Sequence, residues 1–100
     1  MQIDLPALLE KLTALKPDLR RRFGVSAIFV FGSHARGEAG AESDLDLLVD
    51  FAAEARPTLF SLSDLDRALE AALGVKVDVV PRASLNPRLE PYIRAELIAA

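Results

Sequence analysis

The segment from Val30 to Phe51 constrains the fold of this 100-residue chain more than any other. Its first two residues belong to an unbroken apolar run, Ala27 to Phe31. Such a run is typical of a central strand buried on both faces of a sheet. Gly32 and Ser33 follow at once: without a Cβ the backbone can approach a phosphate, and the hydroxyl can donate to it. A short helix starting at Ser33 would aim its free amides at the same anion. Taken alone, this dipeptide is more often an ordinary strand-ending turn.

A second strand is predicted over residues 44–51, and it carries acids on one face. Because strand side chains alternate between faces, Asp44, Asp46 and Leu48 share one face, and the inward face comprises Leu45, Leu47, Val49 and Phe51. The Cα atoms of the two acids would lie about 6.6 Å apart. Carboxylates at that separation can converge on metal ions about 3.5–4 Å apart. A strand with one solvated face would show the same pattern, so the spacing alone is weak evidence.

Two other motifs, one that binds phosphate and one that binds calcium, do not match the residues of this segment. Gly32 and Gly37 have the glycine spacing of a P-loop, but Glu38 stands where that loop needs lysine. A calcium-binding EF-hand loop starting at Asp44 would need glycine where Val49 stands. Neither a P-loop nor an EF-hand is therefore predicted.

Two motifs in this order and spacing carry a resemblance to a known family. They are Gly32-Ser33-x-Ala35-Arg36-Gly37 and Ser43-Asp44-x-Asp46-Leu47-x-Val49. Together they resemble the signature of the DNA polymerase beta-like nucleotidyltransferase superfamily, and within it the minimal nucleotidyltransferases. Members of that group are about as short as this chain, and they are the antitoxin half of prokaryotic pairs whose toxin is a HEPN-domain protein.

The resemblance implies three acids that act in catalysis and bind metal. Asp44 and Asp46 would hold two magnesium ions. The third acid is expected on a later strand, and Asp78 is the candidate, within the predicted strand 76–81. Without the family, a lone acid in an apolar strand is either solvent-facing at an edge or a ligand.

The resemblance also implies a nucleotide site, with ATP as the substrate, around the loop between the first two strands. Gly32 and Ser33 would hold the β and γ phosphates. Arg36 would contact the triphosphate or pair with an acid such as Glu38, and an ion pair or partner contact is favoured. Ser43 would order the turn before the acidic strand, beside the nucleotide. His34 is expected to face solvent.

The fold predicted for residues 1–100 is a single α/β domain, a small mixed β-sheet flanked by helices. A helix is expected over residues 4–22, broken or kinked at Pro17. A second is expected from about 60 to 73, capped by a Ser61-x-x-Asp64 pattern. A C-terminal helix would become regular only at Pro91. The short first connection favours antiparallel pairing of the first two strands.

The chain ends Ile98-Ala99-Ala100, which predicts no fourth strand, so the expected sheet has three strands. The net charge of −3 argues against broad nucleic-acid binding, and Arg20 to Arg22 fit a helix C-terminus better than a phosphate contact. No apolar run approaches the ~18 residues of a membrane span, and with no cysteine and no signal pattern a cytoplasmic protein is expected.

The leading functional hypothesis is transfer of AMP from ATP to a hydroxyl, with two magnesium ions. Because 100 residues leave no second domain to shape a small-molecule pocket, another protein is the more plausible acceptor. The resemblance implies a tyrosine of a HEPN toxin. A non-catalytic antitoxin and a nucleotidyltransferase acting on a small molecule stay open as alternatives, as does the oligomeric state.

Overall fold

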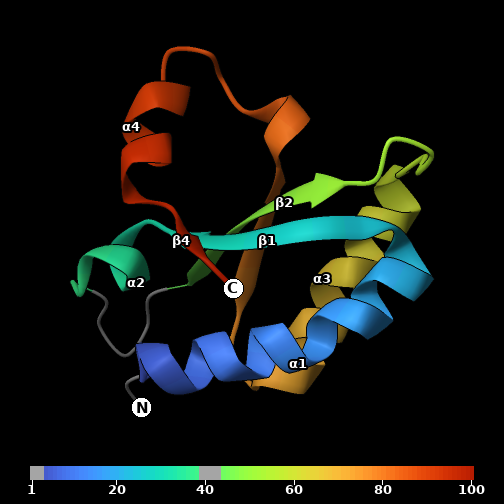
Figure 1. The fold of residues 1–100 in the computed structure, drawn as a ribbon, viewed down its shortest axis with the longest axis horizontal. Coiled ribbons are helices and arrows are strands. Elements are labelled where there is room, and N and C mark those ends of the chain that lie inside the picture. Colours follow the sequence, from blue (N-terminus) through green and yellow to red (C-terminus); the bar gives the residue numbers. More distant parts are fainter. Residues whose placement is uncertain (1–3, 39–43) are drawn as a thin grey trace.

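The computed structural model describes residues 4–38 and 44–100. In chain order the elements are α1 (Leu5–Phe23), β1 (Val25–Phe31), α2 (Ser33–Arg36), β2 (Leu45–Phe51), α3 (Leu59–Leu73), β3 (Val77–Pro81), a 3-10 turn η1 (Arg82–Ser84), α4 (Glu90–Glu96) and β4 (Ile98–Ala99) (Figure 1). No helix in the described part of the chain is long and apolar enough to cross a membrane.

The strands form one mixed sheet in the order β3-β2-β1-β4. β1 is antiparallel to β2, as predicted, and also to β4, whereas β2 and β3 are parallel. The expectation of three strands is wrong. β4 has only two residues, but it pairs with Phe29 and Val30 on the open edge of β1, and the amide of Ala100 adds a bond to the carbonyl of Ile28 at 3.0 Å. The unpaired backbone groups of a central strand thus order a segment too short to show a strand pattern.

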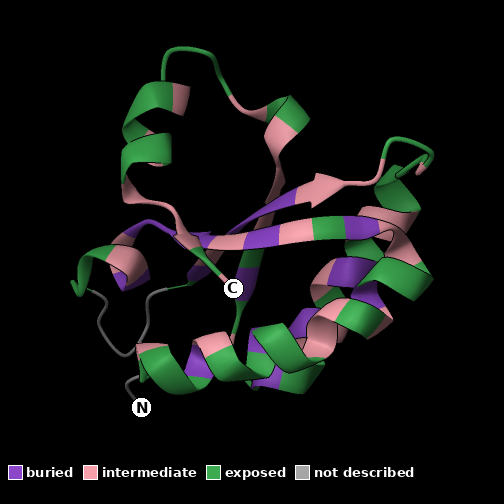
Figure 2. Cartoon of the chain, in the orientation of Figure 1, coloured by how far each residue is buried: buried purple, intermediate pink, exposed green. Residues whose placement is uncertain are grey.

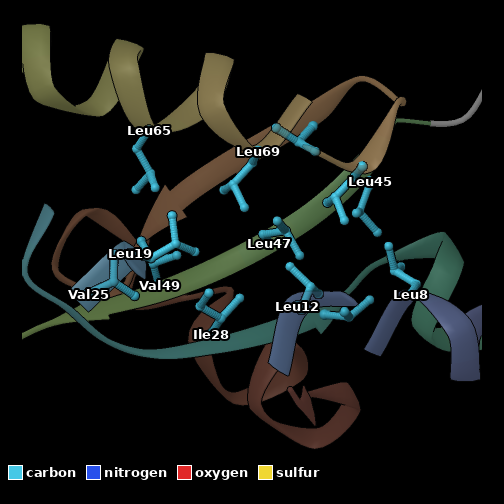
Figure 3. Packing of buried hydrophobic residues seen from close by; sticks show 13 residues of the cluster. Leu8, Leu12, Leu19, Val25, Ile28, Leu45, Leu47, Val49, Leu65 and Leu69 are labelled. Carbon is cyan, nitrogen blue, oxygen red and sulfur yellow. The ribbon is translucent and has the colours of Figure 1, made fainter. Parts of the chain in front are cut away.

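The core lies on one face of the sheet, under α1 and α3 (Figure 3). Three of the four predicted inward residues of β2, Leu45, Leu47 and Val49, are fully buried there, in one cluster with Leu12 of α1 and Leu65 of α3. The fourth, Phe51, is partly buried against this cluster. Burial is greatest in β1 and β2 and least along α4 (Figure 2). β2 is therefore the strand around which the apolar interior is built.

The opposite face of the sheet is covered only beyond its acidic end. Leu48 is fully buried on this face, and Phe29 lies opposite it in β1. The Arg82 guanidinium lies 5.2 Å from the centre of the Phe29 ring and bonds Asp50 at 2.7 Å. Phe29 is only half-buried, so the predicted burial of β1 on both faces holds fully for the core face alone.

α1 continues through Pro17, so the predicted break does not occur, and the alternative prediction of a kink is not contradicted. The helix runs from Leu5 to Phe23 with Pro17 inside it. Proline leaves the carbonyl of Thr13 without its helical donor, but both residues are exposed, so water can satisfy that carbonyl. Leu12 and Leu19 are buried on either side of the proline and anchor both halves to the sheet.

The start of α3 also differs from the prediction. Thr58, rather than Ser61, is the N-cap: its side chain accepts from the amide of Ser61, whose hydroxyl in turn accepts from the amide of Thr58 at 2.7 Å. Ser61 occupies the third helical position, where a side-chain acceptor completes a capping box. α4 begins at Glu90 with Pro91 in its first turn, within one residue of the expected start.

Truncation of β2 tests the location of the core. Leu47→Ala should lower the free energy of unfolding by about 2–5 kcal/mol, because it leaves a cavity at a fully buried position. The matched control Leu59→Ala, at a side chain that is 83% exposed, should change it by less than about 0.5 kcal/mol. Urea denaturation measures both, and equal effects would contradict the assignment.

Candidate active site

The ends of β2 and β3 place the three predicted acids together. Asp46 and Asp78 lie directly opposite one another in the parallel register of the two strands, so their side chains share a face. That face is opposite to Leu45 and Val77, the next residue pair in the same register, which are buried in the core. Asp44 immediately precedes β2 and is close enough for its charge to act on Asp46. The structure thus brings Asp44, Asp46 and Asp78 to one face.

The surroundings of Asp46 raise the pKa of its carboxyl above the ordinary value. Burial is the largest cause, and the like charges of Asp78 and Asp44 add to it. The positive charges of His34 and Arg36 act in the opposite direction and do not cancel the rise. A carboxylate that is partly desolvated and repelled by two neighbours is a site that a divalent cation would stabilise.

The acids do not form a complete metal cage by themselves. Among residues 4–38 and 44–100, no group of three or more His, Cys, Asp or Glu side chains is arranged to hold a metal ion. Magnesium suits such a site, because it usually takes one or two carboxylates and completes its coordination with substrate phosphates and water. The donor set therefore fits a metal that arrives with a nucleotide.

The turn after β1 packs against Asp46 at Gly32. The Gly32 φ of +75° lies in the region that favours glycine, and a Cβ at this position would lie 2.2 Å from Oδ2 of Asp46. A side chain there would have to displace the catalytic candidate. The close approach explains physically why glycine stands between the apolar strand and Ser33, which opens α2.

His34 does not face solvent, contrary to expectation. It is 7% exposed, and its Nδ1 has no hydrogen-bond partner within the described residues. The short helix turns His34 back toward the sheet, where its charge acts on Asp46. A single histidine in a polar segment gives no periodicity from which burial could be predicted.

Arg36 is engaged in ion pairs. Its Nε lies 3.2 Å from Glu38 and its Nη1 lies 2.9 Å from Glu96. The hydrogen bond to Glu96 is the main cause that raises the pKa of Arg36, followed by that to Glu38. The partner Glu38 was within reach of sequence reasoning, but Glu96, which lies 60 residues away, was not. Ser43, the remaining predicted nucleotide contact, lies outside the described residues.

Comparisons with known proteins identify the family of this chain. Residues 12–99 match the family described as nucleotidyltransferase domain. The protein adenylyltransferase MntA of Thermococcus cleftensis is 47% identical over 87 residues, which make up 87% of this chain and 86% of that protein.

Solved structures of other proteins resemble the fold of this chain. One that is provisionally assigned as a minimal nucleotidyltransferase is 45% identical, with a TM-score of 0.70 over 90% of this chain and 93% of that chain. A crystal structure of a toxin-antitoxin with AMP-PNP is 25% identical, with a TM-score of 0.74 over 91% of this chain and 70% of that chain. This chain therefore belongs to the nucleotidyltransferase domain family and, within it, to the minimal nucleotidyltransferases.

Proposed function

We propose that this chain transfers the AMP group of ATP to a hydroxyl of a partner protein. The observation that carries the proposal is the pairing of Asp46 with Asp78 on one sheet face, with the Gly32 backbone packed against the Asp46 carboxylate. Similarity to an MntA protein adenylyltransferase supports the reaction class. A structural neighbour that contains AMP-PNP supports an adenine nucleotide as the donor.

The acids divide the chemistry between them. Asp44, Asp46 and Asp78 would hold magnesium, which supplies charge neutralisation at the triphosphate when bound. Gly32 and Ser33 would hold the β and γ phosphates, leaving the α-phosphorus beside the acids. The acceptor oxygen then forms a bond to the α-phosphorus while the bond to pyrophosphate breaks, and Asp78 accepts the hydroxyl proton. Asp78 is exposed, so an acceptor can reach it from solvent.

The acceptor we propose is a tyrosine of a HEPN-domain toxin, so that the chain acts as the antitoxin of the pair. The toxin-antitoxin neighbour supports a protein partner. The acidic end of the sheet supports it too, because Asp78 is exposed there, whereas α1 and α3 cover the core face (Figure 1). Another protein can therefore place a hydroxyl at the acids.

Removal of one acid tests catalysis directly. With magnesium, ATP labelled at the α-phosphate and the product of the neighbouring gene as acceptor, Asp46→Asn should lower the rate of labelling by at least about a hundredfold. The control Asp64→Asn changes a carboxylate on α3 that is 65% exposed, and it should stay within about twofold of wild type. An Asp46→Asn variant that labels the partner normally would refute the proposal. One that silences the toxin without labelling it would favour neutralisation by binding alone.

The same variant should be more stable than wild type at neutral pH. Because folding raises the pKa of Asp46 above 3.8, ionisation of its carboxyl costs stability, and this cost grows as pH rises from 3.8 through the raised pKa. Asp46→Asn removes it, so its Tm should exceed that of wild type at pH 7, and the gap should close as pH falls toward 3.8. Asp50→Asn, which breaks the pair with Arg82, should instead lower Tm. Calorimetry across pH measures both, and a lower Tm for Asp46→Asn would contradict the electrostatic account.

A methyl group at Gly32 tests the contact between turn and acid. Gly32→Ala and Gly74→Ala both place alanine at a positive φ. Gly32, with ψ −152°, lies in a region almost restricted to glycine, whereas Gly74, with ψ 19°, is in the left-handed helical region, so Gly32→Ala carries the larger backbone strain. Only Gly32→Ala also collides with Asp46, since a Cβ at Gly74 meets no atom of the described residues within 4 Å. We expect both to lose stability and only Gly32→Ala to lose affinity for magnesium-ATP, measured by titration calorimetry. Equal affinities would show that the contact is unimportant for binding.

A further inference from the structure

We propose that Glu96, near the C-terminus, is a positioning residue that holds the Gly32-Ser33 turn in the geometry required for nucleotide binding. The inference rests on the proposed function, because it assigns a role in the same site. Glu96 contacts the backbone of Gly32 and the side chain of Arg36, and both of these residues in turn act on Asp46. Its contribution is therefore to the arrangement of the site and not to the reacting atoms.

The contacts of Glu96 join both ends of α2. The amide of Gly32, the N-cap of this helix, donates to Oε1 of Glu96 at 3.0 Å. The guanidinium of Arg36, the last residue of the helix, donates to Oε2 at 2.9 Å and to Oε1 at 3.2 Å. One carboxylate thus binds the first and the last position of the same short element.

A helix of this length needs such support. α2 has four residues, and an isolated helix of that size is not stable in water. Its own backbone adds a bond from the amide of Arg36 to the carbonyl of Gly32 at 3.1 Å. Hydrogen bonds to an ionised acceptor are about twice as strong as neutral ones. Glu96 therefore supplies the strongest contacts that fix where α2 begins.

β4 places Glu96 where the turn needs an acceptor. In the antiparallel register Val30 lies opposite Ile98, so two further steps along each strand bring Gly32 opposite Glu96. β4 has ended by that point, and the Glu96 carboxylate takes the place of the next backbone acceptor. The amide of Ala100 bonded to Ile28 fixes this register. The chain terminus thus anchors the turn from the edge of β1.

The anchored residue, Gly32, is packed closely against Asp46. Gly32 is buried, and its Cα packs so close to Asp46 that a methyl group attached to it would fall 2.2 Å from Oδ2. A shift of the Gly32 backbone therefore changes the space between the turn and the acid. Since Ser33 is the next residue, the same shift moves the hydroxyl assigned to the phosphates.

The chain offers a matched control for the test. Glu90 lies on the same helix, pairs with Arg94, and has a side chain 25% exposed against 24% for Glu96. Glu96→Ala should raise the Kd for magnesium-AMP-PNP about tenfold, because it removes charge-assisted bonds to the turn. Glu90→Ala should leave the Kd within about twofold. Glu96→Gln, which keeps an acceptor for the Gly32 amide, should fall between wild type and Glu96→Ala.

A spectroscopic measurement separates positioning from general stability. With ¹⁵N-glycine the spectrum of the chain contains five backbone signals. In Glu96→Ala the Gly32 amide should exchange with solvent at least about tenfold faster, while the Gly74 amide, bonded to Glu70 at 2.8 Å, should be unchanged. Equal acceleration of both amides, or a Kd equal to that of Glu90→Ala, would overturn the proposal. A wild-type chain that binds AMP-PNP but transfers nothing from ATP would overturn the proposed function and leave this one standing.

Discussion

The structure depends on holding like charges together at the ends of β2 and β3, on the face opposite to a tightly packed core. The acids of β2 and β3 repel each other, and burial of Asp46 adds to the cost of its charge. Leu45, Leu47 and Val49, on the opposite side of β2, bury their full side chains under α1 and α3. Burying such side chains contributes about 1.5–3 kcal/mol each, so the core can tolerate a destabilised acidic surface. Strain of this kind is typical of sites that bind cations.

Much of the fold could be predicted because its main elements have local patterns. The alternation in residues 44–51 identified the inward face of β2 and the acidic face together, and the apolar run before Gly32 identified β1. The predicted break at Pro17 does not occur, because Pro17 and Thr13 face water, which can bond to the carbonyl that proline leaves without a donor. The fourth strand was missed because two residues carry no periodicity, and their order comes from the edge of β1.

The site was predictable to the extent that its residues are close in sequence. Gly32, Ser33, Asp44 and Asp46 stand within fifteen residues of one another and form two compact motifs. Asp78 required the family's expectation of a later acidic strand, and the parallel register then places it opposite Asp46. Burial of His34 and the Glu96 contacts depend on how α2 and α4 dock. No pattern within either helix encodes that docking.

The two outer strands of the sheet have a consequence for how molecules of this kind meet others. Unpaired strand edges recruit further strands and promote aggregation. On one side β4 is an edge strand of only two residues, paired with Phe29 and Val30, and on the other β3 ends in Pro81, which lacks an amide to donate. Both edge strands are thus poorly suited to pair with the backbone of another strand. Recognition of another protein would then fall to side chains, which discriminate between partners far better than a bare row of peptide groups.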